Sequence, residues 1–251
     1  MTTAAKLVPL EIGRLDSDLM DLVGSPGQVR MPIPSWIIEH PRGLVMFDTG
    51  LHQELQTTTS RLQGLFADTV VDYHAGEELP TKLSGAGYRP SDIDVVIISH
   101  LHFDHVGGMA DVPDARVIVQ QAEWKAGHHP KLVEVGYYNP DDFDVGHEVQ
   151  PIDGAHDVFG DGTIVCIPTP GHTKGHQALR VELPSGPVVL TADCIYFSQM
   201  LDEMRTPAYG FDTEQQLASM RTLRDMRDDG CRLIFGHDPE QFRSLPTTGL
   251  T

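Results

Sequence analysis

Three histidines and an aspartate lie close together in residues 99–108, SHLHFDHVGG. Imidazole nitrogens and carboxylate oxygens are the ligands that proteins offer to zinc and related divalent cations. His100 and His102 share one side of an extended chain, whereas Asp104 and His105 are adjacent and must diverge. One ion cannot easily bind all four side chains. The spacing therefore indicates two metal ions, one at His100 and His102 and the other at Asp104 and His105.

Further metal ligands are expected after other apolar runs of the chain. His172 stands in PTPGH, Asp193 in VVLTAD and His237 in LIFGH. In α/β sheets the loops beyond the carboxyl ends of strands converge on one crevice, so these residues are predicted to meet the 99–108 cluster. With them, each of two metal ions approaches four-coordination. Zinc suits this ligand set, and iron, cobalt or manganese would be tolerated.

The elements that must position these residues are predicted from hydrophobic patterning. Short runs rich in Val and Ile, bounded by Gly, Pro and Asp, are typical of buried strands. Helix 214–228 carries an apolar stripe at steps of three, suited to packing on a sheet. No repeat or linker interrupts the chain, so residues 1–251 are predicted to form a single α/β domain. Strands are expected at 36–38, 44–47, 95–98, 116–119, 164–167, 178–183, 188–191 and 233–235, and helices at 82–87, 122–127 and 214–228.

The charge balance and the cysteines limit the classes of partner and compartment. Asp and Glu number 36 against 18 Lys and Arg, and the net charge of −18 repels polyanions and acidic lipid surfaces. We therefore expect no nucleic acid and no membrane as partners. The three cysteines lack close pairing, and neither an apolar leader nor a membrane-length apolar stretch is present. A cytoplasmic protein is expected, and a homodimer is the general expectation for assemblies of this kind.

Several motifs together resemble the metallo-β-lactamase superfamily: HLHFDH followed by two glycines, PGHTKGH, the aspartate of TAD and the histidine of FGHD. FDTG at 47–50 is similar to the superfamily's early D-T-G turn. The resemblance implies an α/β fold, the αβ/βα sandwich of two mixed β-sheets flanked by helices. It also implies that Asp193 bridges two metal ions. One ion would be bound by His100, His102 and His172, and the other by Asp104, His105 and His237.

Departures from other superfamily members narrow the activity. True β-lactamases usually carry cysteine where Asp193 stands, and nucleases must hold a polyanion that the net charge opposes. Cys194 is not expected as a ligand, because neighbours on a strand point to opposite faces. His176 is expected to support the site without binding metal. The D-x-x-Y pattern formed by Asp193 and Tyr196, with PGHTKGHQ, resembles the N-acyl homoserine lactonases.

The lactonase resemblance implies hydrolysis of a small neutral lactone, with N-acyl homoserine lactone as the first expectation. A hydroxide bridging the two metals would attack the carbonyl carbon, and Tyr196 would donate to the developing oxyanion. Asp104 would carry the proton to the departing alkoxide. Four alternatives stay open: another lactone such as 4-pyridoxolactone, a small acyl thioester, an iron-dependent oxidation like that of persulfide dioxygenases, and metal binding without turnover.

An apolar slot for the acyl tail is expected from residues near the N-terminal loop and just after Tyr196. The segment 128–146 is expected to be a long loop whose aromatic residues cover a ligand. The slot candidates are Met20, Leu22, Phe197, Met200 and Met204, and the covering candidates are Tyr137, Tyr138 and Phe143.

Overall fold

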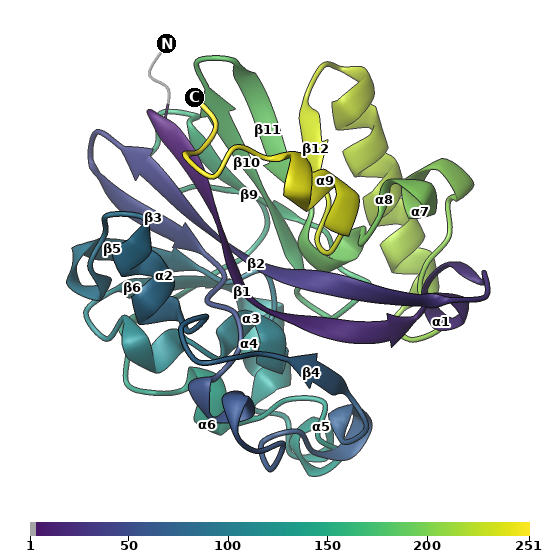
Figure 1. Ribbon diagram of the computed structural model, residues 1–251. Helices are drawn as coiled ribbons and strands as arrows, with labels where there is room; N and C mark the ends of the chain where they lie inside the picture. The colour runs from purple at the N-terminus through teal and green to yellow at the C-terminus, as the bar shows by residue number, and fades with distance from the viewer. Residues whose placement is uncertain (1–3) are drawn as a thin grey trace.

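Two β-sheets form the centre of the fold in the computed structural model, which describes residues 4–251 (Figure 1). The larger sheet has the strand order β4-β1-β2-β3-β5-β6-β7 and the smaller β12-β11-β10-β9-β8, and both mix parallel with antiparallel pairs. The larger sheet consists of β1 (Lys6–Asp18), β2 (Gln28–His40), β3 (Gly43–Phe47), β4 (Val70–Asp72), β5 (Ile93–Ile97), β6 (Arg116–Gln120) and β7 (Val149–Ile152). The smaller consists of β8 (His156–Asp157), β9 (Ile164–Pro168), β10 (Gln177–Leu183), β11 (Gly186–Leu190) and β12 (Arg232–Ile234).

The helices pack against these sheets, with α8 beside β12, α4 beside β6 and α2 beside β1 (Figure 1). No helix within residues 4–251 combines the length and apolar character needed to cross a membrane. The α-helices are α1 (Leu19–Val23), α2 (Leu79–Gly85), α3 (Phe103–Val106), α4 (Gln121–Gly127), α5 (Pro130–Glu134), α6 (Pro140–Phe143), α7 (Ser198–Glu203), α8 (Thr213–Asp228) and α9 (Pro239–Ser244). Short 3-10 turns are η1 (Gln53–Gln56), η2 (Gly64–Phe66), η3 (Pro90–Asp92), η4 (Met109–Asp111) and η5 (Ala192–Cys194).

Alternating side chains place one apolar layer between the sheets and a second under the helices. On β10, Leu179 is buried in the cluster that also holds Ile97 of the larger sheet. Its neighbour Ala178 belongs to the other cluster, with Met220 and Leu223 of α8. Strands covered on both faces carry continuous apolar runs, which is why their positions could be predicted from the sequence. The predicted sandwich of two mixed sheets flanked by helices is confirmed.

All eight predicted strands and all three predicted helices are present. Most ends are displaced by at most three residues, but the predicted strand 36–38 is only part of β2, which begins at Gln28. Strand β1 was missed although it is 13 residues long. Its register with β2 shifts between Glu11 and Arg14, and Gly13 there has a positive φ of 81°, so the bulge breaks the alternation of apolar and polar residues. Segment 128–146, predicted as a loop, contains the short helices α5 and α6. Prolines at the start of both helices fix their first turns.

Candidate metal centre

The loops that follow β5, β9, β11 and β12 meet at one end of the sandwich, as the sequence predicted. They bring together three overlapping groups of potential metal ligands, and every member is buried. The groups are His100, His102 and His172; His100, His105 and Asp193; and Asp104, His105 and His237. All seven ligand candidates predicted from the sequence therefore lie in one cluster.

Three imidazole nitrogens converge on the first position. Nδ1 of His102 lies 2.9 Å from Nε2 of His100 and 3.1 Å from Nε2 of His172. Zinc held at about 2.0–2.1 Å from each nitrogen places tetrahedral ligands about 3.3 Å apart, so these spacings fit a bound cation. His100 and His102 approach one another because they alternate along an extended loop, as predicted.

The second position lies beside the first turn of α3. Nε2 of His105 is 3.5 Å from Oδ2 of Asp104, and His237 completes the group. That nitrogen of His105 is buried and forms no hydrogen bond, although carboxylate oxygens of Asp104 and Asp193 lie 3.5 and 3.1 Å away. A buried polar atom without a partner is costly, and a cation bound to its lone pair would remove the cost. The donor set fits a second divalent ion.

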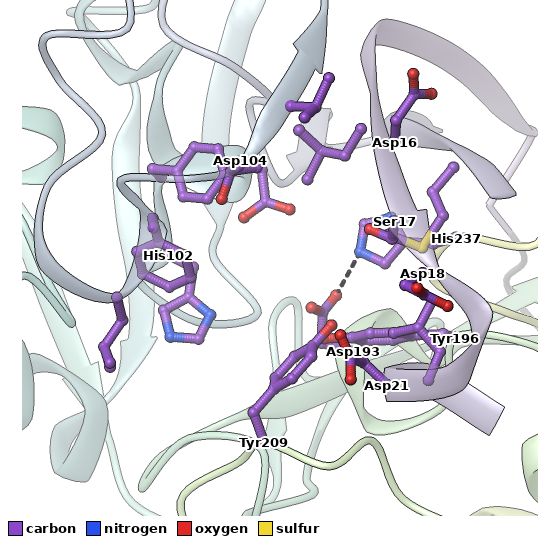
Figure 2. A pocket seen from close by; sticks show the side chains of 18 of the residues that line it. Asp16, Ser17, Asp18, Asp21, His102, Asp104, Asp193, Tyr196, Tyr209 and His237 are labelled. Atoms are coloured by element: carbon purple, nitrogen blue, oxygen red, sulfur yellow. Dashed lines mark hydrogen bonds and ion pairs between the residues drawn. The ribbon is translucent and has the colours of Figure 1, made fainter. Parts of the chain in front are cut away.

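Asp193 lies between the two positions and turns one carboxylate oxygen toward each. Its Oδ2 is 3.3 Å from Nε2 of His172 and 3.9 Å from Nε2 of His100. Its Oδ1 is 2.9 Å from Nε2 of His237 and 3.1 Å from Nε2 of His105. Figure 2 shows the Asp193 carboxylate pointing at His237 from below the cavity. This arrangement is suited to a carboxylate shared by two cations.

The turn η5 after β11 sets the position of Asp193. Ala192 has a positive φ of 43°, so the chain leaves the strand direction directly before the aspartate. The amides of Gly236 and His237 donate to the carbonyls of Ile195 and Tyr196 at 2.9 and 3.2 Å. A Cβ at Gly236 would lie 2.4 Å from the carbonyl oxygen of Ala192. Close backbone packing thus fixes Asp193 against the loop that carries His237.

Two ligand candidates are oriented by hydrogen bonds from their outer nitrogens. Nδ1 of His237 donates to the carbonyl of Pro32 at 2.9 Å, so its Nε2 presents a lone pair to the centre. Nδ1 of His105 lies 2.9 Å from Oδ2 of Asp48. Asp48 also accepts from the amide of Ser99 at 2.7 Å. The early D-T-G turn identified in the sequence therefore orients His105, a role that its motif alone did not specify.

Burial and local charge set the ionisation of the centre. Burial, reinforced by neighbouring imidazoles, holds the pKa of His100 and of His102 well below the ordinary value, so both are neutral. Burial alone would raise the pKa of Asp193, but His237, His105 and His100 hold it well below the usual range. The same carboxylate raises the pKa of His237 against the opposing effect of burial. Positive charge is thus favoured beside Asp193, and a divalent cation would supply it.

A cavity of about 390 Å³ opens onto these residues. Figure 2 shows Tyr196 and Tyr209 beside Asp193, with Asp104 and His102 across the cavity. Tyr196 is buried, and burial followed by the charge of Asp193 raises its phenol pKa well above the ordinary value. The hydroxyl therefore keeps its proton and can donate it in a hydrogen bond. The apolar wall includes Leu15, Leu22, Met31, Leu65 and Phe66.

Residues 29–237 match the family model of the metallo-beta-lactamase superfamily. The chain belongs to the metallo-beta-lactamase superfamily. It is 31% identical to N-acyl homoserine lactonase AttM of Azorhizobium caulinodans over 97% of both chains. It is 32% identical to an N-acyl homoserine lactonase of a Bacillus species over 96% of both. A solved N-acyl homoserine lactone hydrolase with N-hexanoyl-L-homoserine at its catalytic metal centre matches with a TM-score of 0.86 and 28% identity, covering 97% of each chain.

The histidine and aspartate groups are those of a metal-dependent hydrolase of this superfamily. Cys194 takes no part in the three groups and lies in the apolar core, as expected. The reason differs from the expected one, since Asp193 and Cys194 stand in the turn η5 and not on a strand. His176 is buried and lies outside the groups, with its ring centroid 5.2 Å from that of His100. Its predicted supporting role stays a prediction.

The cavity wall differs from the slot predicted by sequence. Of the five slot candidates only Leu22 lines it; Met20 is exposed, and Phe197 and Met200 lie in the core. Met204 also packs against that core. The apolar wall comes from several segments that are distant in the chain. They are β1 with Leu15, α1 with Leu22, β2 with Met31, and the turn η2 with Leu65 and Phe66.

The aromatic residues of segment 128–146 divide between the cavity and the core. Tyr137 lines the cavity and donates to the carbonyl of His172 at 2.9 Å, whereas Tyr138 and Phe143 are buried outside it. Tyr209 lines the cavity without having been identified from the sequence. It lies in the stretch between α7 and α8, which has no periodic pattern to mark it.

Proposed function

We propose that this protein hydrolyses the ester bond of a lactone ring, with N-acyl homoserine lactones as the first substrate class. The observation that carries the proposal is the position of Asp193, which turns one oxygen to each histidine group directly below a cavity that also contains Tyr196. Relatives that match along nearly the whole chain are N-acyl homoserine lactonases. The catalytic metal centre of a solved relative holds the ring-opened product of such a reaction.

In this proposal, His100, His102 and His172 would hold one divalent cation and Asp104, His105 and His237 the other. Asp193 would offer one carboxylate oxygen to each. Such a pair of cations, zinc being our proposal, supplies an activated water and Lewis-acid stabilisation of oxygen anions. All seven residues are buried, and solvent reaches them through the cavity that five of them line.

Tyr196 donates a hydrogen bond to the lactone carbonyl oxygen as negative charge develops there. Its hydroxyl is preorganised, because the ring packs against two imidazoles with centroids 5.0 Å from His237 and 5.9 Å from His172. A fixed donor in a site of low dielectric stabilises an oxyanion without reorganisation at the moment of reaction. The raised phenol pKa keeps the proton available across the neutral range.

Asp104 moves the proton in the same proposal. Its carboxylate lines the cavity and lies across it from Tyr196 (Figure 2). One oxygen faces His105 at 3.5 Å, which leaves the other free to take a proton from the attacking water. Asp104 then delivers that proton to the alkoxide oxygen that leaves when the ring opens.

The cavity walls favour a neutral substrate with an apolar tail. Leu15, Leu22, Met31 and Phe66 form the apolar side. The rim of the cavity carries carboxylates that repel anions. Together with the net charge of −18, these carboxylates disfavour nucleic acids as substrates. These rim residues are Asp16, Asp18, Asp21 and Asp68.

A panel of lactones with varied rings and acyl tails tests the proposal. Acid release by zinc-loaded protein is followed in a pH-stat, with metal counted in the same sample and chelator-treated protein as the control. We expect hydrolysis of N-acyl homoserine lactones that is lost with the metal. Turnover confined to acyl thioesters, or oxygen uptake by an iron-loaded sample without hydrolysis, would overturn lactone hydrolysis. Turnover confined to 4-pyridoxolactone would overturn N-acyl homoserine lactones as the substrate class.

A further inference from the structure

Glu123 is a fully buried carboxylate that belongs to none of the ligand groups and does not line the cavity. It stands in the first turn of α4, which follows β6 of the larger sheet. Isolated charges are costly to bury, and such a residue is retained only where it is fully hydrogen-bonded. The partners of Glu123 therefore indicate what it does.

Four hydrogen bonds satisfy the Glu123 carboxylate. Its Oε1 accepts from the amide of Leu101 at 3.1 Å and from the phenol of Tyr138 at 2.9 Å. Its Oε2 accepts from the hydroxyl of Thr173 and from the amide of Gly175, both at 2.8 Å. Oε1 thus binds the segment of Leu101 and that of Tyr138, and Oε2 binds the segment of Thr173 and Gly175.

These partners lie beside the three histidines of the first metal position. Leu101 stands between His100 and His102 in the loop after β5, and Thr173 directly follows His172 in the loop after β9. One loop extends from the larger sheet and the other from the smaller, so Glu123 connects ligand loops of both sheets. None of its partners belongs to the second metal position, which consists of Asp104, His105 and His237.

Close packing reinforces the connection. A Cβ at Gly175 would lie 2.2 Å from the backbone nitrogen of Glu123 and 2.7 Å from its Cβ. Only glycine lets the loop after β9 approach the first turn of α4 so closely. The carboxylate therefore reaches the loop through short hydrogen bonds at a fixed place.

We propose that Glu123 is a positioning residue for the first metal position: it sets the separation of His102 and His172 by holding their two loops. The inference rests on the proposed metal centre. It predicts that loss of the carboxylate weakens one metal position and spares the other. A residue that merely stabilised the fold would affect both positions alike.

The test is Glu123→Gln, with the affinities of the two bound ions measured by chelator competition and thermal unfolding measured on metal-free protein. Whichever way the amide points, its NH₂ group faces two donors, so one loop loses its acceptor. We expect one of the two ions to bind about 10–100-fold more weakly, in the range found for groups that orient metal ligands. The other ion is expected to stay within about twofold of wild type.

Asp142→Asn is the matched control. This buried carboxylate in α6 accepts from Arg61 and Asn139 and from neither ligand loop. It should lower the unfolding temperature and leave both metal affinities unchanged. If Glu123→Gln does not fold, Thr173→Val removes one 2.8 Å donor and is expected to weaken the same ion by a smaller factor.

The outcomes separate the two proposals. A wild-type protein that binds fewer than two ions would overturn the metal centre itself. Suppose that wild type binds two ions, and that Glu123→Gln and Thr173→Val weaken the binding of both ions equally or of neither. This result would overturn only the role of Glu123.

Discussion

The phenol ring of Tyr196 stands at 87° to the imidazole of His237, with the ring centroids 5.0 Å apart. This edge-on contact fixes the ring, while the residue also lines the cavity above Asp193. Tyr196→Phe keeps the ring and removes only the hydroxyl. We expect kcat to fall roughly 100–1,000-fold, the usual cost of one oxyanion donor, with both metals retained. An unchanged rate would eliminate the proposed donor.

Removal of the shared carboxylate should empty the centre. In Asp193→Ala the imidazoles of His105 and His237 lose an anion 3.1 and 2.9 Å away. We expect fewer than two metal ions per chain by elemental analysis after dialysis, together with loss of hydrolysis. Full retention of two ions would contradict the sharing of Asp193.

Asp104→Asn separates proton transfer from metal binding. The amide keeps an oxygen that can face the second position, but it can neither take up nor release the proton. General acid–base steps contribute about 10²–10⁴-fold, and we expect a loss of kcat in that range. Single-turnover kinetics on variant protein with two counted ions provide the measurement. A rate equal to that of wild type would exclude Asp104 as the proton carrier.

Gly107 holds the histidine cluster against the D-T-G turn. A Cβ there would lie 2.0 Å from the amide nitrogen of His52 and 2.4 Å from the carbonyl carbon of Leu51. Gly107→Ala must displace backbone, so we expect a loss of about 1–3 kcal/mol in the free energy of unfolding. Denaturant unfolding of metal-free protein measures it.

Gly85→Ala is the control for that substitution. Nothing lies within 4 Å of a Cβ at Gly85, in helix α2, so no loss of stability is expected there. Equal effects of the two substitutions would contradict the role given to Gly107.

The acidic rim should discriminate between substrates by charge. A homoserine lactone whose acyl tail ends in a carboxylate would meet Asp18 and Asp21, so we expect a lower kcat/KM than for the neutral analogue of equal length. The two kcat/KM values should become more alike at high salt, because exposed charges are screened beyond about 10 Å at 0.1 M. Asp21→Asn should make the two values more alike at low salt as well. Equal kcat/KM values at low salt would contradict the prediction.

The ligand cluster could be predicted because most of its residues stand close together in the sequence. His100, His102, Asp104 and His105 follow a continuous apolar run, and such runs mark strands covered on both faces. The rule that loops at strand ends converge then placed His172, Asp193 and His237 with them. Both steps need only an apolar run and the residues that directly follow it in the sequence.

The cavity wall and the supporting contacts could not be predicted in the same way. Leu15 and Met31 reach the cavity through the pairing of β1 with β2, whose register is broken by the bulge at Gly13. The partners of Glu123 lie in loops from both sheets, and no sequence pattern encodes that meeting. Such contacts depend on tertiary packing.

Anomalous X-ray scattering from crystals of zinc-loaded protein shows directly whether two metal ions share Asp193. We predict two scattering peaks roughly 3.5–4 Å apart, one beside each carboxylate oxygen of Asp193. The first should be surrounded by His100, His102 and His172, and the second by Asp104, His105 and His237. A single peak, or peaks that do not contact Asp193, would contradict a centre in which two ions share this carboxylate.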